Sequence, residues 1–172
     1  MIISPSELRA HVDTTEADEI LMVRLAAIEA VIREYTNNNF QQRGARFIAK
    51  SSGPFLYGNY RFFNVGDTVE ISMSEVNDGL YLVDSVGDGY IEIEGDLFDV
   101  DFNLVTKVVY PPDVVQCAVD LFKWKMTMGN KVGVKSETLS RHSVTYEDSA
   151  TLYMGYPVGI LNGLKLHKKV RF

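Results

Sequence analysis

The sequence has a single cysteine, Cys117, so no disulfide bond can form within the chain. This excludes the small secreted domains that depend on disulfide bonds. No run of about eighteen apolar residues occurs, which excludes a membrane-spanning helix of ordinary length. The opening residues, MIISPSELRA, lack the basic and apolar segments of a secretion signal. We therefore expect a chain that is made, and folds, in a reducing cytosol.

The motifs of common catalytic sites are also missing. The sequence has no G-x-x-x-x-G-K phosphate loop and no G-x-S-x-G nucleophile motif. Its three histidines are not spaced as metal ligands, and Ser140 lies too close to His142 along the chain to face it as a nucleophile. The segment 99–103 begins like a calcium loop but lacks the later glycine and glutamate of such loops. The sequence thus predicts no enzyme, no cofactor and no metal site.

Basic residues are absent from the segment 62–106, which contains eleven acidic residues. The last thirteen residues, ILNGLKLHKKVRF, show the opposite bias. They contain no acid and four cations, which are Lys165, Lys168, Lys169 and Arg171. Such asymmetry concerns partners and orientation, not the fold. We expect the basic end to be an arm that docks on an acidic partner surface, although a solvated tail without a role also fits.

Two segments before residue 40 have helical patterns. SPSELRAHVD predicts a short helix that Ser4 or Ser6 caps, and EADEILMVRLAAIEAVIREYT predicts a long one that ends at the asparagines 37–39. The long segment repeats apolar residues at helical spacing from Leu21 to Tyr35. A second group of apolar residues makes the apolar surface of this helix wider than packing against one core requires. This group comprises Ile20, Val23, Ala27, Ala30 and Val31.

From about Arg46 the apolar period changes to two. RFIAK, TVEISMSEV, GLYLVDSV, GYIEIEG and NLVTKVVY predict about five short strands separated by turns, in a small antiparallel module resembling a β-barrel. The aromatic stretch GPFLYGNYRFF has the composition of a nucleic-acid stacking strip. The acidic surroundings favour a barrel wall or a contact surface instead.

The segment YPPDVVQCAVDLFKWKMTMGN predicts a helix that is apolar nearly all round and is therefore buried on both sides. In so short a chain, the second apolar side of this helix is suited to contact with a neighbouring subunit. A serine-rich ribbon follows, with alternating residues from His142 to Tyr146, and a helix from about Pro157 comes last. The predicted fold is α+β, with a core of three to four helices from residues 1–43 and 110–172 and an inserted β-rich module at 44–109.

The order of these elements resembles the head–tail connector proteins of tailed bacteriophages, also called adaptor or head-completion proteins. The match covers about 6–40 and 111–172, and its most specific part is VKSETLSRHSVTYE after the buried helix. The resemblance implies a structural virion protein at the head–tail junction that forms a ring, usually of twelve subunits. It also implies contacts with the portal protein and a tail-side connector or stopper, and a passage for DNA without specific binding. The inserted β module departs from the simplest members.

Three groups of residues are the candidate contacts. The subunit interface is assigned to Val23, Ala27, Val31, Leu121, Trp124 and Met128. The ribbon, assigned to assembly by pairing with a neighbouring chain, includes Ser136, Glu137, Ser143, Val144 and Tyr146; a local hairpin is the other interpretation. Docking on a partner is assigned to Lys165, Lys168, Lys169 and Arg171. A monomeric β-barrel binding module, carried on helices in another virion or host-interacting protein, stays open as a second function.

Overall fold

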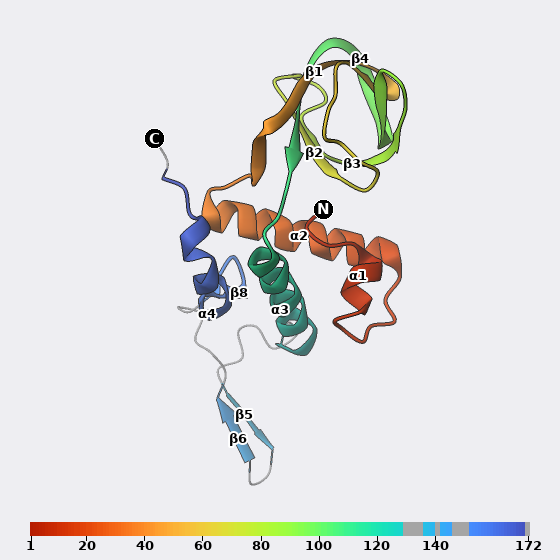
Figure 1. Ribbon diagram of the computed structural model, residues 1–172. Helices are drawn as coiled ribbons and strands as arrows, with labels where there is room; N and C mark the ends of the chain where they lie inside the picture. Colours follow the sequence, from red (N-terminus) through yellow and green to blue (C-terminus); the bar gives the residue numbers. More distant parts are fainter. Residues whose placement is uncertain (129–135, 140–141, 146–151, 171–172) are drawn as a thin grey trace. The chain divides into compact units, whose positions relative to one another are not determined.

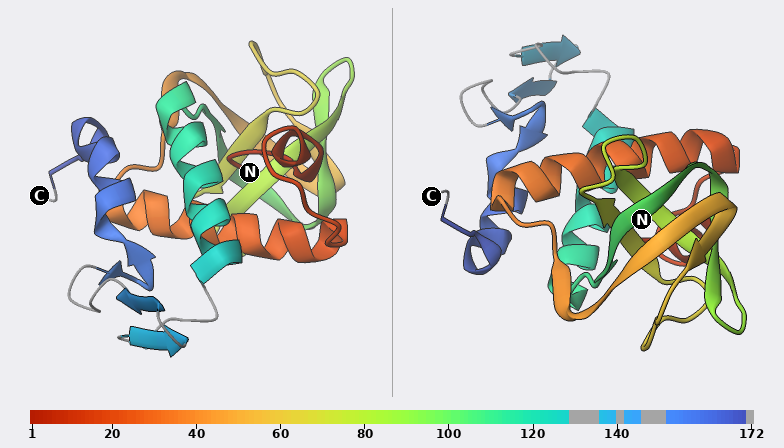
Figure 2. Two further views of the ribbon diagram at one scale, coloured as in Figure 1. Left: turned by 90° about the horizontal axis from the view of Figure 1, so that it is seen from below. Right: turned by 90° about the horizontal axis from the view of Figure 1, so that it is seen from above.

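The computed structural model describes residues 1–128, 136–139, 142–145 and 152–170 (Figures 1 and 2). The chain divides into two compact units. The β unit comprises Met1 and Asn39–Tyr110, and the helical unit comprises Ile2–Asn38 and Pro111–Phe172. The sequence placed the first boundary at residues 43 and 44. In the structure it comes five residues earlier, because the first strand already begins at Gln41.

The helical unit begins with α1 (Pro5–Arg9) and α2 (Asp18–Thr36). Ser4 caps α1 in a reciprocal capping box with Glu7, in which the Ser4 side chain accepts a hydrogen bond from the Glu7 backbone. Helix α2 ends because Asn37 adopts a left-handed conformation (φ 47°), which asparagine tolerates. Both helices agree with the sequence pattern.

The third helix, α3 (Pro112–Met128), lies across α2 (Figures 1 and 2). It is followed by the hairpin β5 (Ser136–Leu139) and β6 (His142–Thr145) and by the strand pair β7 (Leu152–Tyr153) and β8 (Tyr156–Pro157). The chain then forms α4 (Val158–Leu161) and the 3₁₀ helix η3 (Asn162–His167), where one continuous helix was predicted. The apolar core includes Leu8, Leu21, Leu25, Ile28, Ile32, Val114, Phe122, Leu161 and Leu164.

The β unit is one antiparallel sheet of four strands, β1 (Gln41–Tyr57), β2 (Thr68–Ser72), β3 (Gly79–Val86) and β4 (Tyr90–Val108). The strand order is β1-β4-β2-β3, and β3 also pairs with the start of β4. The sequence predicted two strands where β4 is a single strand, because Gly95 and Asp96 looked like a turn. The antiparallel sheet confirms the α+β class. The strands do not close into a barrel, so the barrel-like description is not confirmed.

The core of the β unit lies on one face of these strands and contains Phe47, Ala49, Leu56, Phe63, Val69, Ile71, Val83, Ile91, Ile93, Leu97 and Val105. The two ends of the unit lie side by side. The Val109 amide donates to the Phe40 carbonyl at 3.0 Å, and the rings of Phe40 and Tyr110 are 5.0 Å apart. Adjacent ends allow such a unit to be inserted in another fold.

Candidate assembly surfaces

An apolar row remains exposed on α2. Val23 is 72% exposed and Ile20 is 50% exposed, and Ala27 and Ala30 are exposed on the following turns. The opposite side of the helix, from Leu21 to Ile32, is buried in the core of the helical unit. Large apolar side chains on the surface are typical of contact sites when they occur together. Val23 and Ala27 therefore remain candidate interface residues.

Two of the residues assigned to the subunit interface are core residues of the chain itself. Val31 is only 5% exposed and Leu121 is fully buried, so neither can face another subunit. Apolar residues on several sides of a helix show that those sides are buried. They do not show whether another part of the same chain or a second subunit buries them.

The second side of α3 is covered from within the chain. The Cys117 sulfur lies 3.8 Å from the Ile160 carbonyl oxygen, and the ring of the half-buried Trp124 lies 6.1 Å from that of Tyr156. The C-terminal elements thus occupy the place that the sequence assigned to a neighbouring subunit. The side chain of Met128 lies outside the described residues.

The serine-rich ribbon is a hairpin within the chain. Strands β5 and β6 pair antiparallel, with Ser136 opposite Thr145, Glu137 opposite Val144 and Thr138 opposite Ser143. This is the local hairpin that the sequence left open, and it replaces the expected pairing of these strands with a neighbouring chain. Tyr146 lies outside the described residues, as do the side chains of both strands.

The basic end is anchored to the helical unit through Lys169. Its amide donates to the Thr36 carbonyl at 2.8 Å, and its carbonyl accepts from the Asn37 side chain at 3.2 Å. The Lys168 ammonium lies 3.7 Å from the centre of the Tyr35 ring. The expected loose arm is therefore wrong for residues 165–169, and truncation after Leu164 would remove contacts that hold the unit together. Arg171 lies outside the described residues.

One side-chain hydrogen bond fastens this end to α3. His167 Nε2 and Asp113 Oδ2 are 2.6 Å apart, and this hydrogen bond is the main reason why the pKa of Asp113 is lowered. The Lys165 and Lys169 side chains are exposed, and the Leu166 side chain between them is 94% exposed. The segment 165–169 is thus a fixed, exposed basic surface, which we call the basic segment.

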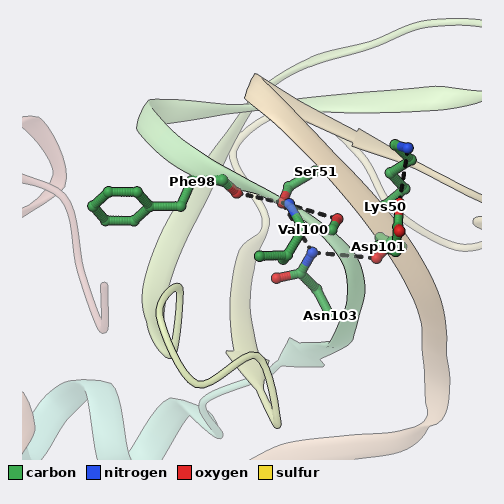
Figure 3. A network of polar contacts seen from close by, with 7 residues as sticks. Lys50, Ser51, Phe98, Val100, Asp101 and Asn103 are labelled. Carbon is green, nitrogen blue, oxygen red and sulfur yellow. Dashed lines mark hydrogen bonds and ion pairs between the residues drawn. The ribbon is translucent and has the colours of Figure 1, made fainter.

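A buried polar network organises the middle of the β unit (Figure 3). The Asn77 side chain donates hydrogen bonds to Ser51 Oγ at 3.2 Å, to the Phe98 carbonyl at 2.9 Å and to Asn103 Oδ1 at 3.2 Å. It also accepts a hydrogen bond from the Phe98 amide at 2.9 Å. Ser51 and Asn103 are fully buried, and Asn103 also donates to the Ala49 carbonyl. The network ties the segment 73–78 to the irregular part of the β1–β4 pairing. No pattern in the sequence predicts it.

A shallow hollow of about 170 Å³ lies beside this network. Its lining comprises Lys50, Ser51, Ser52, Asp99, Val100 and Asp101. Lys50 and Asp101 form an ion pair of 2.8 Å across it, which raises the pKa of Lys50 and lowers that of Asp101. Since Lys50 pairs with Asp101 and Asp99 accepts a hydrogen bond from the Gly53 amide, the hollow has the character of a surface ion pair and not of a ligand site.

The aromatic stretch 53–63, which begins in β1 and continues beyond it, divides between the two faces of the sheet. Leu56 and Phe63 are buried in the core. Phe55 and Tyr57 lie on the opposite face together with Tyr90 of β4, where the ring centres of Phe55 and Tyr90 are 5.2 Å apart and those of Tyr57 and Tyr90 are 6.0 Å apart. We call these three residues the aromatic face. The sequence anticipated a core wall or a contact surface, and the stretch supplies side chains to both faces.

Chemically reactive groups are few in the described part of the chain. Burial raises the pKa of the Cys117 thiol to about 12, so the thiol stays protonated and unreactive near neutral pH. No group of three metal-ligating side chains lies together among the residues that the structure describes.

No protein-family model matches the chain, and no curated protein matches it. Within the described ranges, none of the helices combines the length and apolar character needed to span a membrane.

Proposed function

We propose that the protein is a structural subunit of the head–tail connector of a tailed bacteriophage. In this role it forms a ring between the portal and the tail, leaves a passage for DNA and offers a docking surface to tail-side proteins. It is made in the host cytoplasm and acts in the virion, at the head–tail junction. The observation that carries the proposal is the order of elements: the buried helix α3 is followed by the hairpin β5–β6 and then by a short helical C-terminal segment, as in the family that the sequence resembles.

The exposed row on α2 supports assembly. Ile20 and Val23 present large apolar surfaces to water, and Ala27 continues the row as a small residue that allows close approach. Burying one side chain such as valine or isoleucine at an interface contributes about 1.5–3 kcal/mol. A neighbouring subunit that covers this row supplies the contact that the isolated chain lacks.

The charge distribution agrees with DNA passing through without binding. The β unit contains eleven acidic residues and five basic ones, so it carries the whole net charge of −6. Acidic surfaces repel phosphate and release no counterions on contact with it. Duplex DNA should therefore form no tight complex in a gel-shift titration at about 150 mM salt; submicromolar binding would favour a nucleic-acid-binding protein.

The direct test is assembly. We expect the molar mass in solution to rise with concentration toward that of a ring, electron micrographs to show annular particles, and purified portal to retain the protein on a sizing column. Portal retention is included because a ring that forms only on the portal would leave the free chain monomeric. A protein that stays monomeric and also passes the portal without binding would contradict the proposal.

A second candidate is a monomeric binding module of another virion or host-interacting protein. It would use the β unit, which we regard as barrel-like because β4 pairs with all three other strands. The aromatic face favours this candidate, since exposed aromatic clusters are common in binding sites. A stable monomer whose isolated β unit binds host-cell or virion surfaces would support it over the connector.

A further inference from the structure

The aromatic face is a fixed apolar surface. Tyr57 and Tyr90 are directly opposite in the β1–β4 register, and Phe55 lies two residues before Tyr57 on the same side of β1. The Tyr90 ring covers Gly87, where a Cβ atom would lie 2.3 Å from the ring. Glycine at this position therefore leaves room for the ring. The three rings contact one another, by an edge contact between Phe55 and Tyr90 and by tilted contacts of Tyr57 with both.

Three carboxylates lie along β4 or in the turn that precedes it. Glu92 lies opposite Phe55 and accepts a hydrogen bond from Ser85 at 2.7 Å, Asp88 is exposed in the turn before Tyr90, and Glu94 is the next outward residue along β4. The faces of aromatic rings attract cations, and nearby carboxylates add to that attraction. This surface is therefore suited to a basic segment that also contains an apolar side chain.

The chain itself contains such a segment. In the basic segment, Leu166 lies between Lys165 and Lys169 and is almost completely exposed. Hydrogen bonds from Asn37 and Asn38 to the Lys169 and His167 carbonyls hold its backbone in place. A segment that is already ordered loses little conformational entropy on binding.

We propose that the aromatic face of one copy binds the basic segment of the next copy. The proposal rests on the connector function and specifies one contact between subunits. Leu166 packs on the rings, while Lys165 and Lys169 pair with the three carboxylates. Since the two surfaces differ, the contact is head-to-tail, which is the type that closes into a ring when the rotation between subunits permits.

Charge reversal tests the contact through mixing. One variant carries Lys165→Glu and Lys169→Glu, and the other carries Asp88→Lys and Glu94→Lys. Each variant alone places like charges against each other, so its self-association should weaken about tenfold or more. In an equal mixture, the unchanged aromatic face of the first variant can bind the unchanged basic segment of the second. The charge-reversed segment of the first variant can likewise bind the charge-reversed face of the second. Sedimentation analysis of the mixture should therefore recover the association of the wild-type chain.

A matched control carries Arg43→Glu and Lys123→Glu, two exposed cations outside the basic segment, and it should associate like the wild-type chain. The mixture identifies the contact as intermolecular, because a contact within one chain is not repaired by mixing. Lack of recovery on mixing, unchanged association of both variants, or a wild-type chain that does not self-associate at any concentration would overturn the proposal.

The connector function is tested separately by portal retention of the same variants. If the mixture recovers association but no sample binds portal, the contact stands and the connector function fails. If every sample binds portal and forms rings equally well, the connector function stands and this contact is wrong.

Discussion

The two units differ in how they use polar and apolar residues. The helical unit contains twelve acidic and twelve basic residues and is neutral overall, whereas the β unit carries the whole net charge. The β unit buries a hydrogen-bonded network around Asn77, and the helical unit leaves an apolar row exposed along α2. The two units thus differ in their net charge and in the polar groups that they bury.

The largest expected effects come from matched core truncations, one in each unit. Leu121→Ala and Leu56→Ala each remove a fully buried side chain and should each cost about 2–5 kcal/mol of unfolding free energy. Trp124, the only tryptophan, reports on the helical unit. We expect Leu121→Ala to shift the fluorescence transition in urea strongly and Leu56→Ala to shift it little. Equal shifts of that transition would show that the units unfold as one.

The polar network of the β unit should be the next most sensitive feature. Asn77→Ala removes the partner of the Phe98 amide and the donor to the buried Asn103 side-chain oxygen, so we expect a loss of about 1–3 kcal/mol. Circular dichroism of the tyrosines, five of the nine of which are in the β unit, can follow this transition. The control is Asn64→Ala in the same unit, where the side chain is exposed. A loss no larger than that of the control would mean that water replaces the network.

A smaller, pH-dependent effect is expected at the junction of α3 and η3. The hydrogen bond from His167 lowers the pKa of Asp113, so the ionised carboxylate stabilises the fold at neutral pH. This contribution is lost as the pH falls below the ordinary aspartate pKa of about 4 and Asp113 takes up a proton. Asp113 is 56% exposed, so Asp113→Asn should cost only about 0.3–0.5 kcal/mol at pH 7. In urea titrations, the difference between the two proteins should shrink as the pH falls through the lowered pKa of Asp113; a constant difference would exclude the ionised carboxylate as the cause.

The smallest effect on folding is expected at the exposed row of α2. Val23→Asp should change the unfolding free energy by no more than about 0.5 kcal/mol, because the side chain is 72% exposed. The same change should abolish assembly if the row is a subunit contact. Val31→Asp, eight residues along the same helix, is the contrasting variant, since it places a charge in the core and should unfold the helical unit. Normal assembly of Val23→Asp would exclude the row as an interface.

The sequence by itself determined several of the elements. The helical spacing from Leu21 to Tyr35 predicted α2, the alternation around Phe47 predicted β1, and the left-handed tolerance of Asn37 predicted the end of α2. These features depend on interactions between residues that are close along the chain. Local sequence therefore suffices to predict them.

Tertiary structure alone decided which surfaces are free. The C-terminal elements cover the side of α3 that the sequence left for a neighbouring subunit, and Lys169 is held at the end of α2. Ser51, Asn77 and Asn103 come from three separate segments and meet only in the folded β unit. A periodic pattern in the sequence shows that a side chain is buried, but it does not identify the residue that buries it, because that residue lies far away along the chain. Only the folded chain brings such partners together.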